Sequence, residues 1–528
     1  MSTPLLKEVN ASDLVSPQRL DIVVKYLYAK ELYCGNLSNK IKSLYARHIL
    51  MRTGGVEPPS AIASDPPPKK EFLQDYFDAF AKLMQSIKEN GFDNKTPVPV
   101  SKINNLPLNG AHRIACSAAL GQKIKVHFDE RPGGAWDFTW FAEHGFSTED
   151  IMYILSGFMK IHPDKTAIMV VWNPMFKHLD HIRKIVSTDF DIVGEVDLDF
   201  ENNFIAFKNI LLDIYEPNGS YINKSTFDTI TAKADLLAAF QLTFKVIVIA
   251  CKDSADIHQT LINTKTQIRD LFDHEIPKKV FATIHTSSNA DEARYLGNIL
   301  LSPNNIKQLK GRLGFRYNQD FINVCYCAKE AVLKLGLELD DAANIGSSVM
   351  IAYGIKEFAD IDLIVKYKHR DKIGDAPIKN ITANVDLCAR GNKHALPLDD
   401  DYIIGNQDNY FYFCGLKFAN LNIIKERKKL NMTDKNKRYL RQIDLYENYI
   451  GHIEQERVFS AFIKAELDRR TAISNLQPTT VNTQERKTVI CSKPTQKKIS
   501  KIAIKFLSCF IPKKSTRRQF RAKYSGKN

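Results

Sequence analysis

The sequence predicts an α/β protein of several domains, and three observations lead to this prediction. The chain has 528 residues, and at about 150 residues per domain this length corresponds to three or four domains. Apolar residues make up 44% of the chain and charged residues 25%, an ordinary globular balance that allows several buried cores. Strand-like apolar runs alternate along the chain with segments whose apolar residues recur at helical spacing, the pattern of an α/β protein.

The first predicted domain, residues 1–140, combines a helical segment with a small α/β unit. Apolar positions at helical spacing run through Leu20–Leu50, and a stretch rich in glycine and proline from Gly54 to Lys70 then predicts a long loop. The elements expected after this loop are a helix over 71–91, a strand over 96–103, a short helix over 114–121 and a strand over 123–128.

The second predicted domain, residues 141–312, repeats a strand, helix and strand order. The expected strands are residues 166–172, 191–198, 244–251 and 280–286, and the expected helices include 176–186 and 291–301. A strand, helix, strand unit that occurs twice in succession favours an α/β sandwich of the ferredoxin type.

The third predicted domain covers residues 313–470 and contains a helix over 327–336, a strand over 384–389 and a charged helical segment from 421 to 468. Residues 471–496 are rich in threonine, glutamine and asparagine without periodic apolar positions, which is typical of a linker. Residues 497–528 form a separate tail.

Cysteine usage and the lack of long apolar runs exclude several classes of protein. Nine cysteines with no Cys-x-x-Cys pair form neither a disulfide framework nor a zinc ribbon, and they fit a reducing cytoplasm. The N-terminal residues lack a basic region followed by an apolar core, and no stretch approaches the roughly 18 apolar residues of a membrane span. We therefore expect a cytoplasmic protein that is neither secreted nor membrane-spanning.

The positive charge is concentrated in the tail. The chain carries a net charge of +14, and residues 486–528 contain fourteen Lys and Arg and no acidic residue, which leaves the rest of the chain balanced. Ile499, Ile502, Phe506 and Phe510 recur at three- and four-residue steps with lysines between them, so the tail predicts a basic amphipathic helix on an anionic bilayer. A nucleic-acid-binding tail is the alternative. The tail resembles the ending of many bacterial glycosyltransferases and surface-polysaccharide enzymes.

The sharpest motif combines a glycine-serine pair with three carboxylates. Gly346 and Ser347 are followed by Asp360 and Asp362 at alternate positions of a predicted strand, and Asp386 lies on a later strand. Such carboxylates can share a face and hold a divalent cation. The motif resembles the nucleotidyltransferase superfamily that includes DNA polymerase beta. The resemblance implies catalytic aspartates that bind Mg²⁺ or Mn²⁺ and a Gly-Ser turn whose backbone N–H groups approach a nucleoside triphosphate. The alternative is that the aspartates end an exposed strand.

A predicted strand pair and basic helix follow this motif. The candidates for binding phosphates are Lys417, Lys425, Arg427 and Arg438, with a solvated helix face as the alternative for most of them. The stretch resembles the segment after the nucleotidyltransferase core in bacterial capsule and lipopolysaccharide gene-cluster proteins.

A second motif precedes the predicted short helix at residue 114. Gly110 offers a turn into a helix N-terminus, while His112 and Arg113 supply a proton donor and a two-pronged phosphate ligand. The motif resembles the ParB/sulfiredoxin-like fold, in which such a turn binds nucleotide phosphates. Asn109 stands where the most similar version has aspartate, which puts catalysis by this turn in doubt. The alternative is a helix cap whose arginine forms a surface ion pair.

A third pattern extends over residues 165–305 and contains a histidine close to hydroxyl and carboxyl groups. The residues concerned are His285, Ser287, Ser288 and Glu292. A histidine can carry a phosphoryl group, and Lys265 or Arg269 would neutralise its charge. The order of elements resembles that of nucleoside diphosphate kinases, with Thr286 in place of the glycine that follows their catalytic histidine. A structural or sugar-phosphate-binding role is the alternative.

Together these resemblances imply a transferase of bacterial capsule or lipopolysaccharide assembly. It would move a phosphoryl, nucleotidyl or phospho-substituent group from a nucleotide donor, with magnesium, onto a glycan or lipid-linked acceptor at the cytoplasmic membrane face. The alternatives are a glycosyltransferase that uses Asp360 and Asp362 to bind a nucleotide sugar through a metal ion, a nucleotide-binding scaffold without turnover and a nucleic-acid-processing protein.

Overall fold

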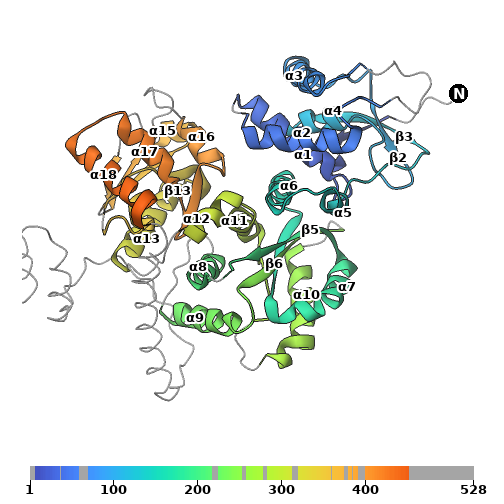
Figure 1. Ribbon diagram of the computed structural model, residues 1–528. Helices are drawn as coiled ribbons and strands as arrows, with labels where there is room; N and C mark the ends of the chain where they lie inside the picture. The colour runs from blue at the N-terminus through green and yellow to red at the C-terminus, as the bar shows by residue number, and fades with distance from the viewer. Residues whose placement is uncertain are drawn as a thin grey trace, which may run out of the picture. The chain divides into compact units, whose positions relative to one another are not determined.

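The computed structural model is a mixed α/β protein with three separate β-sheets (Figure 1). The described residues belong to one compact unit, Met1–Phe462. The structure describes residues 6–35, 37–58, 69–201, 203–216, 224–252, 257–276, 282–311, 319–357, 359–373, 378–382, 384–389 and 399–450. The predicted linker and tail therefore lie outside the described residues.

The first sheet has three strands in the order β1-β3-β2, with β3 antiparallel to β1 and parallel to β2. Its strands are β1 (Leu6–Asn10), β2 (Val98–Ser101) and β3 (Lys123–Asp129). The helices of this part are α1 (Leu20–Tyr33), α2 (Asn39–Thr53), α3 (Leu73–Asn90) and α4 (Ala111–Ala119). The helical pattern predicted through Leu20–Leu50 is divided into two helices, because Gly35 takes a left-handed φ of 70° and ends the first.

Helix α4 begins three residues earlier than the sequence predicts. Gly110 adopts φ 84° at the helix N-terminus, a conformation that glycine adopts without strain. The chain becomes helical at Ala111, and His112 and Arg113 therefore lie in the first helical turn rather than in a turn before the helix.

The second sheet has the strand order β5-β6-β4-β7, and all neighbouring strands are antiparallel. Its strands are β4 (Thr166–Trp172), β5 (Phe190–Asp199), β6 (Thr243–Cys251) and β7 (Ile284–Thr286). The helices are α5 (Phe138–Glu143), α6 (Thr148–Ile161), α7 (Leu179–Asp189), α8 (Phe204–Ile214), α9 (Lys224–Ala238), α10 (Ile257–Phe272), α11 (Ala290–Leu300) and α12 (Pro303–Gly311). Figure 1 shows α7 and α10 on one side of this sheet and α8 and α11 on the other.

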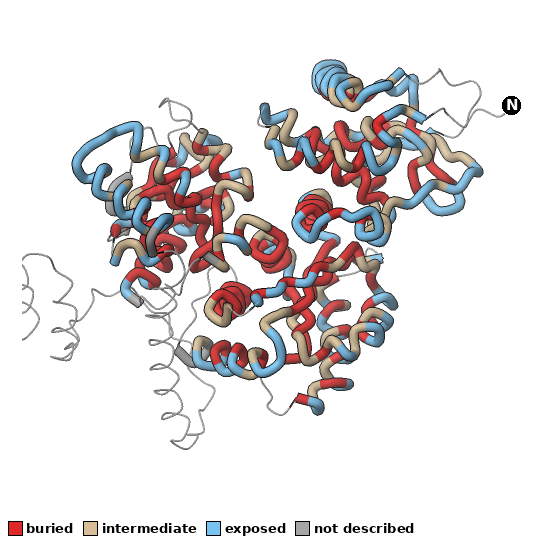
Figure 2. The backbone as a smooth tube through the Cα atoms, in the orientation of Figure 1, coloured by how far each residue is buried: buried red, intermediate tan, exposed pale blue. Residues whose placement is uncertain are grey.

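Burial on both faces explains the continuous apolar run of β4. All seven of its residues are buried (Figure 2), whereas a strand with one solvated face would alternate apolar and polar residues. The four predicted strands of this region are all present. Strand β7 is shorter than predicted, because Ala282 and Thr283 are not part of it, and residues 280 and 281 of the predicted run lie outside the described residues.

The third sheet has six strands in the order β10-β11-β9-β8-β13-β12. Its strands are β8 (Ala342–Asn344), β9 (Ile361–Val365), β10 (Ile378–Thr382), β11 (Val385–Cys388), β12 (Tyr410–Phe413) and β13 (Leu416–Ala419). The helices are α13 (Gln319–Lys334), α14 (Val349–Ala352), α15 (Arg370–Ile373), α16 (Asp400–Gly405), α17 (Leu421–Lys429) and α18 (Asp434–Leu445). The predicted strand pair is the β12–β13 hairpin, and the basic helix that follows is α17.

Short helical turns complete the described secondary structure. They are η1 (Ala11–Leu14), η2 (Asn173–His178), η3 (Asp273–Glu275), η5 (Leu339–Asp341), η6 (Tyr367–His369) and the π-helical η8 (Tyr446–Ile450).

Buried apolar residues form two clusters (Figure 2). One contains residues between 11 and 309 together with Tyr410 and Tyr412, and the other contains residues between 321 and 443. The domain boundaries expected from the sequence stay predictions. In the described part of the chain, no helix has both the length and the apolar character needed to cross a lipid bilayer.

Candidate functional site

Two of the three predicted metal-binding aspartates lie side by side in the third sheet. Strands β9 and β11 are parallel, and their register places Asp386 opposite Asp362. Neighbouring strands lie about 4.8 Å apart, so the two half-buried carboxylates project from the same face as adjacent groups. Like charges in register repel each other, which makes this position favourable for a cation. Asp360 precedes the first residue of β9 and is exposed.

The Gly-Ser turn packs against Asp362. The backbone N–H of Ile345 donates to the Asp362 carbonyl at 3.0 Å, and a Cβ on Gly346 would lie 2.8 Å from the Asp362 carboxyl carbon. Only glycine leaves room for the carboxylate at this point. The sequence predicts that the Gly346 N–H approaches a nucleotide. In the structure this N–H is not available, because it donates to the Asn344 side-chain oxygen at 3.1 Å.

A lysine and a tyrosine lie beside Ser347. The ammonium of Lys356 donates to the Ser347 hydroxyl and to the Tyr439 hydroxyl, each at 3.0 Å. Burial alone would raise the pKa of Tyr439, but its hydrogen bond to Lys356 and the charge of that ammonium lower the pKa overall. The turn thus has a positive charge next to Ser347.

Two more lysines approach the same tyrosine. The ammonium of Lys428, on α17, lies 4.6 Å from the centroid of the Tyr439 ring, and that of Lys435, on α18, lies 6.0 Å away. Burial lowers the pKa of Lys428, and the neighbouring ammonium groups lower it further, while Tyr439 and the Asp362 carboxylate oppose this. Carboxylates therefore meet lysines at one turn, which suits a metal ion together with phosphate groups.

Lys417, predicted to bind phosphate, lies elsewhere. Its buried ammonium donates to the carbonyl oxygens of Asp340 and Ile404 at 2.7 and 3.1 Å. Asp340 precedes strand β8, whereas Gly346 follows it, so the ammonium lies at the opposite end of the strand from the turn.

Two of the other basic candidates of this region are ion-paired, and phosphate binding by the third, Arg438, stays a prediction. The Lys425 ammonium lies 2.5 Å from the Glu447 carboxylate, and the Arg427 guanidinium lies 3.2 Å from that of Asp400. The lysines that do reach the turn, Lys356, Lys428 and Lys435, were not predicted, because no spacing in the sequence separates them from the other basic residues nearby.

The aspartate pair fits a magnesium ion only in combination with a ligand. Within the described ranges, no group of three or more His, Cys, Asp or Glu side chains is placed to hold a metal ion. Magnesium is nevertheless often bound by one or two carboxylates together with substrate phosphates and water. Asp362 and Asp386 satisfy this requirement, and the role of Asp360 stays a prediction.

The residues of the predicted N-terminal phosphate turn have protein partners. The His112 ring nitrogen Nε2 lies 2.9 Å from the Tyr45 hydroxyl. The Arg113 guanidinium donates to the carbonyl oxygen of Thr96 and, at 3.2 Å, to its hydroxyl. The same guanidinium lies 3.1 Å from the place of a Cβ on Gly110, so the arginine folds back over the glycine.

A cluster of cations surrounds His112. Burial lowers the pKa of His112 well below its usual value, and the charges of Lys25, Arg52 and Lys70 lower it further. Lys25 is fully buried, and its ammonium lies 2.9 Å from the Asp21 carboxylate. The same carboxylate also binds the Arg19 guanidinium at 2.7 Å, so one buried acid faces two buried cations.

An unsatisfied histidine lies in the same region. His48 is completely buried, and neither of its ring nitrogens has a hydrogen-bond partner among the residues that the structure describes. Burial lowers the pKa of His48 well below its usual value, and Lys25 contributes to this. The excess of positive charge and the unpaired ring nitrogens favour an anion in this region. The sequence does contain a signal for Lys25, because a charged residue stands there within the apolar run of α1.

His285, in the second sheet, is close to the carboxylate that the sequence suggests. The His285 Nε2 atom lies 3.4 Å from Glu292, and the other oxygen of that carboxylate accepts the Ser288 N–H at 2.7 Å. Burial lowers the pKa of His285, although Glu292 raises it, so the ring is neutral at neutral pH. Ser287 instead joins β7 to β4, because its N–H donates to the Ile168 carbonyl.

Cationic side chains surround His285. Arg269 donates to the Ile284 carbonyl at 3.1 Å, one residue before the histidine, and burial and Arg269 lower the pKa of Lys265. The structure also adds Lys233, which was not predicted. Its buried ammonium donates to the Tyr215 hydroxyl at 2.6 Å, and the Tyr215 ring lies 4.8 Å from that of His285. The predicted histidine, lysine and arginine therefore belong to one cluster.

No protein-family model, curated protein or solved structure matches the chain. The family resemblances suggested by the motifs therefore stay hypotheses, and the arguments below rest on geometry and charge.

Proposed function

We propose that the protein is a transferase that moves a phosphoryl, nucleotidyl or phospho-substituent group from a nucleotide donor at the turn between β8 and β9. The observation that carries this proposal is the register of the third sheet, which pairs Asp362 with Asp386 next to the glycine of a Gly-Ser turn. Lysines near the same turn supply the countercharge that a chain of phosphates requires.

In this proposal, Asp362 and Asp386 hold Mg²⁺ or Mn²⁺, with Asp360 as a further ligand. The ion, when bound, would neutralise charge on the phosphate oxygens. Lys356 and Lys428 bind phosphate oxygens, and Lys356 also holds Ser347 in place through the 3.0 Å hydrogen bond.

Two further phosphate-binding regions belong to the proposal. Gly110, His112 and Arg113, with the cations around them, would bind a second phosphate group of donor or acceptor. His285, with Lys265 and Arg269, would bind or accept a phosphoryl group, and the neutral state of its ring supports this role because only a neutral imidazole is nucleophilic.

The topology supports the finer folds that the sequence suggests. The order β5-β6-β4-β7 separates the two strands of each βαβ unit by a third strand, as in ferredoxin-like sandwiches. The β8, turn, β9 and β11 arrangement is consistent with a nucleotidyltransferase-like sheet. A ParB/sulfiredoxin-like first domain stays a hypothesis that rests on its motif.

The biological setting is inferred from the sequence resemblances. We infer an acceptor that is a glycan or lipid-linked sugar of a bacterial capsule or lipopolysaccharide. The basic tail would hold the enzyme on the cytoplasmic face of an anionic membrane. Nucleic acid is disfavoured as a substrate, because residues before 486 carry equal numbers of basic and acidic side chains.

The decisive test measures magnesium-dependent nucleotide binding. Nucleoside triphosphates and sugar nucleotides are titrated into the full chain with and without Mg²⁺, and the melting temperature is followed, since a ligand at 100 times its dissociation constant stabilises by about 2.7 kcal/mol. We expect Asp362→Asn and Asp386→Asn to lose the magnesium-dependent increase. Asp371→Asn, an exposed change in the same domain, is the control. Equal increases in all variants would contradict the proposal.

A glycosyltransferase is distinguished by the group that moves. With a nucleotide sugar labelled in the sugar and, separately, in the phosphate nearest the sugar, transfer of the sugar label alone identifies a glycosyltransferase. Transfer of the phosphate label supports the proposal.

A nucleotide-binding scaffold without turnover is the second candidate. The observation in its favour is that the described carboxylates do not form a group of three, since Asp360 lies outside β9. Tight magnesium-dependent binding without transfer to any acceptor, in lysates that contain lipid-linked glycans, would favour this role.

A further inference from the structure

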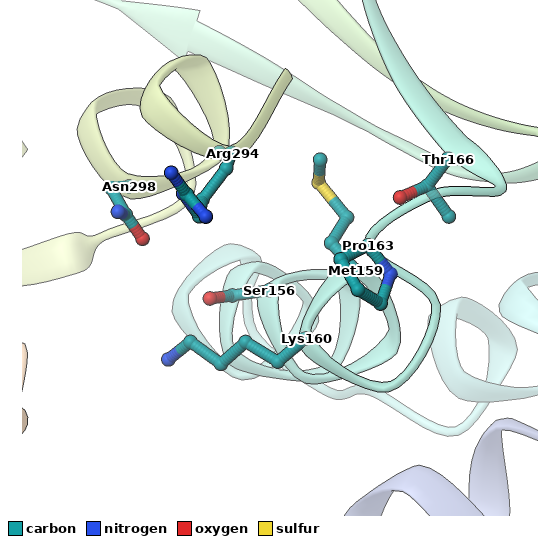
Figure 3. Close-up of a pocket in the computed structure, with 8 residues that line it drawn as sticks. Ser156, Met159, Lys160, Pro163, Thr166, Arg294 and Asn298 are labelled. Atoms are coloured by element: carbon teal, nitrogen blue, oxygen red, sulfur yellow. The ribbon is translucent and has the colours of Figure 1, made fainter. Parts of the chain in front are cut away.

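A pocket of about 170 Å³ lies between helices α6 and α11, next to the start of β4 (Figure 3). Its lining residues are Ser156, Met159, Lys160, Pro163, Thr166, Arg294, Gly297 and Asn298. None of these residues belongs to the three candidate sites described above. A cavity of about 150 Å³ holds a single benzene ring, so this pocket has room for a compact organic molecule.

The two ends of the pocket differ in chemistry. Figure 3 shows the polar groups of Ser156, Lys160, Arg294 and Asn298 on one side, and Met159, Pro163 and Thr166 on the other. Two cationic groups and two neutral hydrogen-bonding groups thus share one end. The opposite end is mainly apolar, because the Thr166 hydroxyl donates to the His162 carbonyl at 2.8 Å.

The polar end has unused binding capacity. Ser156 is 4% exposed and lines the pocket. The Lys160 ammonium forms no ion pair or hydrogen bond with any described residue, and Lys160 is exposed. Burial and the charge of Lys417 lower the pKa of Lys160, while the carboxylates of Asp340, Glu31 and Asp408 oppose this without pairing with it.

Arg294 has room for another anion. Its guanidinium lies 2.9 Å from Asp291 on its own helix and 3.7 Å from Asp340. The Asp340 carboxylate is stabilised independently, because it accepts the Tyr412 hydroxyl at 2.8 Å and lies 3.6 Å from the Lys417 ammonium. Arg294 could therefore bind a ligand without leaving a buried acid unpaired.

Close packing fixes the two helices that carry the cations relative to each other. A Cβ on Gly297 of α11 would lie only 3.1 Å from the Met159 sulfur of α6. Lys160 follows Met159 on α6 and Arg294 lies one turn before Gly297 on α11, so both project from helices in contact.

We propose that this pocket binds a small organic anion. Its acidic head, a carboxylate or a phosphate, lies between Lys160 and Arg294 and accepts a hydrogen bond from the Ser156 hydroxyl. It accepts a second from the Asn298 amide, which has two hydrogens and donates one of them to the Asp340 carboxylate at 3.3 Å. Its compact apolar body packs against Met159 and Pro163. The site is independent of the proposed transferase function.

The test uses three probes of the same shape and different charge, namely benzoate, phenyl phosphate and benzyl alcohol. Binding to the full chain is measured by isothermal titration calorimetry at low salt. We expect benzoate or phenyl phosphate to bind at least ten times more tightly than neutral benzyl alcohol. Lys160→Met should weaken the binding of the anion at least tenfold. Lys165→Met removes an exposed positive charge outside the pocket and should leave this affinity unchanged.

Further variants separate this site from the others. Arg294→Met is expected to act like Lys160→Met, and if it fails to fold, the exposed Lys160→Met change decides the question alone. Lys356→Met, at the Gly-Ser turn, should leave anion binding unchanged. The proposal is overturned by equal binding of all three probes, by absence of binding, by equal affinities of the two lysine variants, or by loss of binding in Lys356→Met.

Discussion

Gly346 is the residue on which the candidate nucleotide site depends most directly. Replacing it with alanine places a Cβ 2.8 Å from the Asp362 carboxyl carbon, so that the carboxylate has to move away from its position opposite Asp386. We expect Gly346→Ala to weaken magnesium-dependent nucleotide binding at least tenfold and to lower the free energy of unfolding by about 1–3 kcal/mol.

The measurement combines nucleotide titration with chemical denaturation. Gly405→Ala is the matched control, because no atom lies within 4 Å of its added Cβ. Unchanged nucleotide affinity in Gly346→Ala would show that the Asp362 position is not required for binding.

The lowered pKa of Lys25 should make the stability of the protein depend on pH. Burial lowers the pKa of Lys25 from 10.5 to about 8, although the Asp21 carboxylate raises it. Between pH 8 and 10.5 the unfolded chain therefore holds more protons at this residue than the folded chain. The free energy of unfolding then rises with pH, by at most about 1.4 kcal/mol per pH unit from this group.

The pH prediction is tested by denaturation at pH 7, 8.5 and 9.5. The wild type should gain stability relative to Lys25→Met as the pH increases through this range. Lys30→Met removes an exposed lysine from the same helix. Its free energy of unfolding should change with pH as that of the wild type does. A constant difference between wild type and Lys25→Met would indicate that Lys25 titrates alike in the folded and unfolded chains.

At the scale of elements, helix α18 contributes side chains to the candidate nucleotide site. The helix carries Lys435 and Tyr439, and Ile443 is its one buried residue. Removing this anchor leaves a cavity in the second apolar cluster, and such changes cost about 2–5 kcal/mol.

We expect Ile443→Ala to increase hydrogen exchange across residues 434–445 and to weaken nucleotide binding more than the loss of global stability explains. Leu445→Ala, whose side chain is about half exposed, is the control in the same helix. Slow exchange of α18 in Ile443→Ala would mean that other contacts hold the helix.

The sequence predicts local elements better than the contacts between them. The pairing of Asp362 with Asp386 could be anticipated, because side chains alternate along a strand and both aspartates stand in apolar runs. The meeting of Lys356 with Tyr439 could not, because it depends on where a distant helix docks. Lys417 was misplaced for the same reason, since its position follows from the pairing of β13 with β8.

The N-terminal motif shows a different limit. The glycine at position 110 correctly indicated a turn into a helix. The sequence did not reveal that Arg113 binds Thr96, or that the cations facing His112 come from Lys25 and Arg52, in helices far from the motif. The motif therefore identified the region around His112. The positive charge of this region could be recognised only from the packing of the helices.

At the scale of the whole molecule, charge separates the body of the chain from the tail. Residues 486–528 carry the entire net charge of +14, and the remainder is balanced. Each basic residue close to an anionic membrane contributes about 1 kcal/mol to binding, so a segment with this many cations should determine membrane association by itself.

We therefore expect the full chain to sediment with vesicles that contain phosphatidylglycerol, and the chain ending at residue 496 to stay in solution. Neutral phosphatidylcholine vesicles should bind neither, and increasing the salt concentration should release the full chain, because screening weakens the electrostatic attraction. Magnesium-dependent nucleotide binding should be equal in the two chains, since the candidate nucleotide site lies within residues 344–439.

Association of the shortened chain with anionic vesicles would place the membrane contact in the part of the chain before the tail. Salt-sensitive binding of the full chain to DNA, with no binding to vesicles, would instead identify the tail as a nucleic-acid-binding segment.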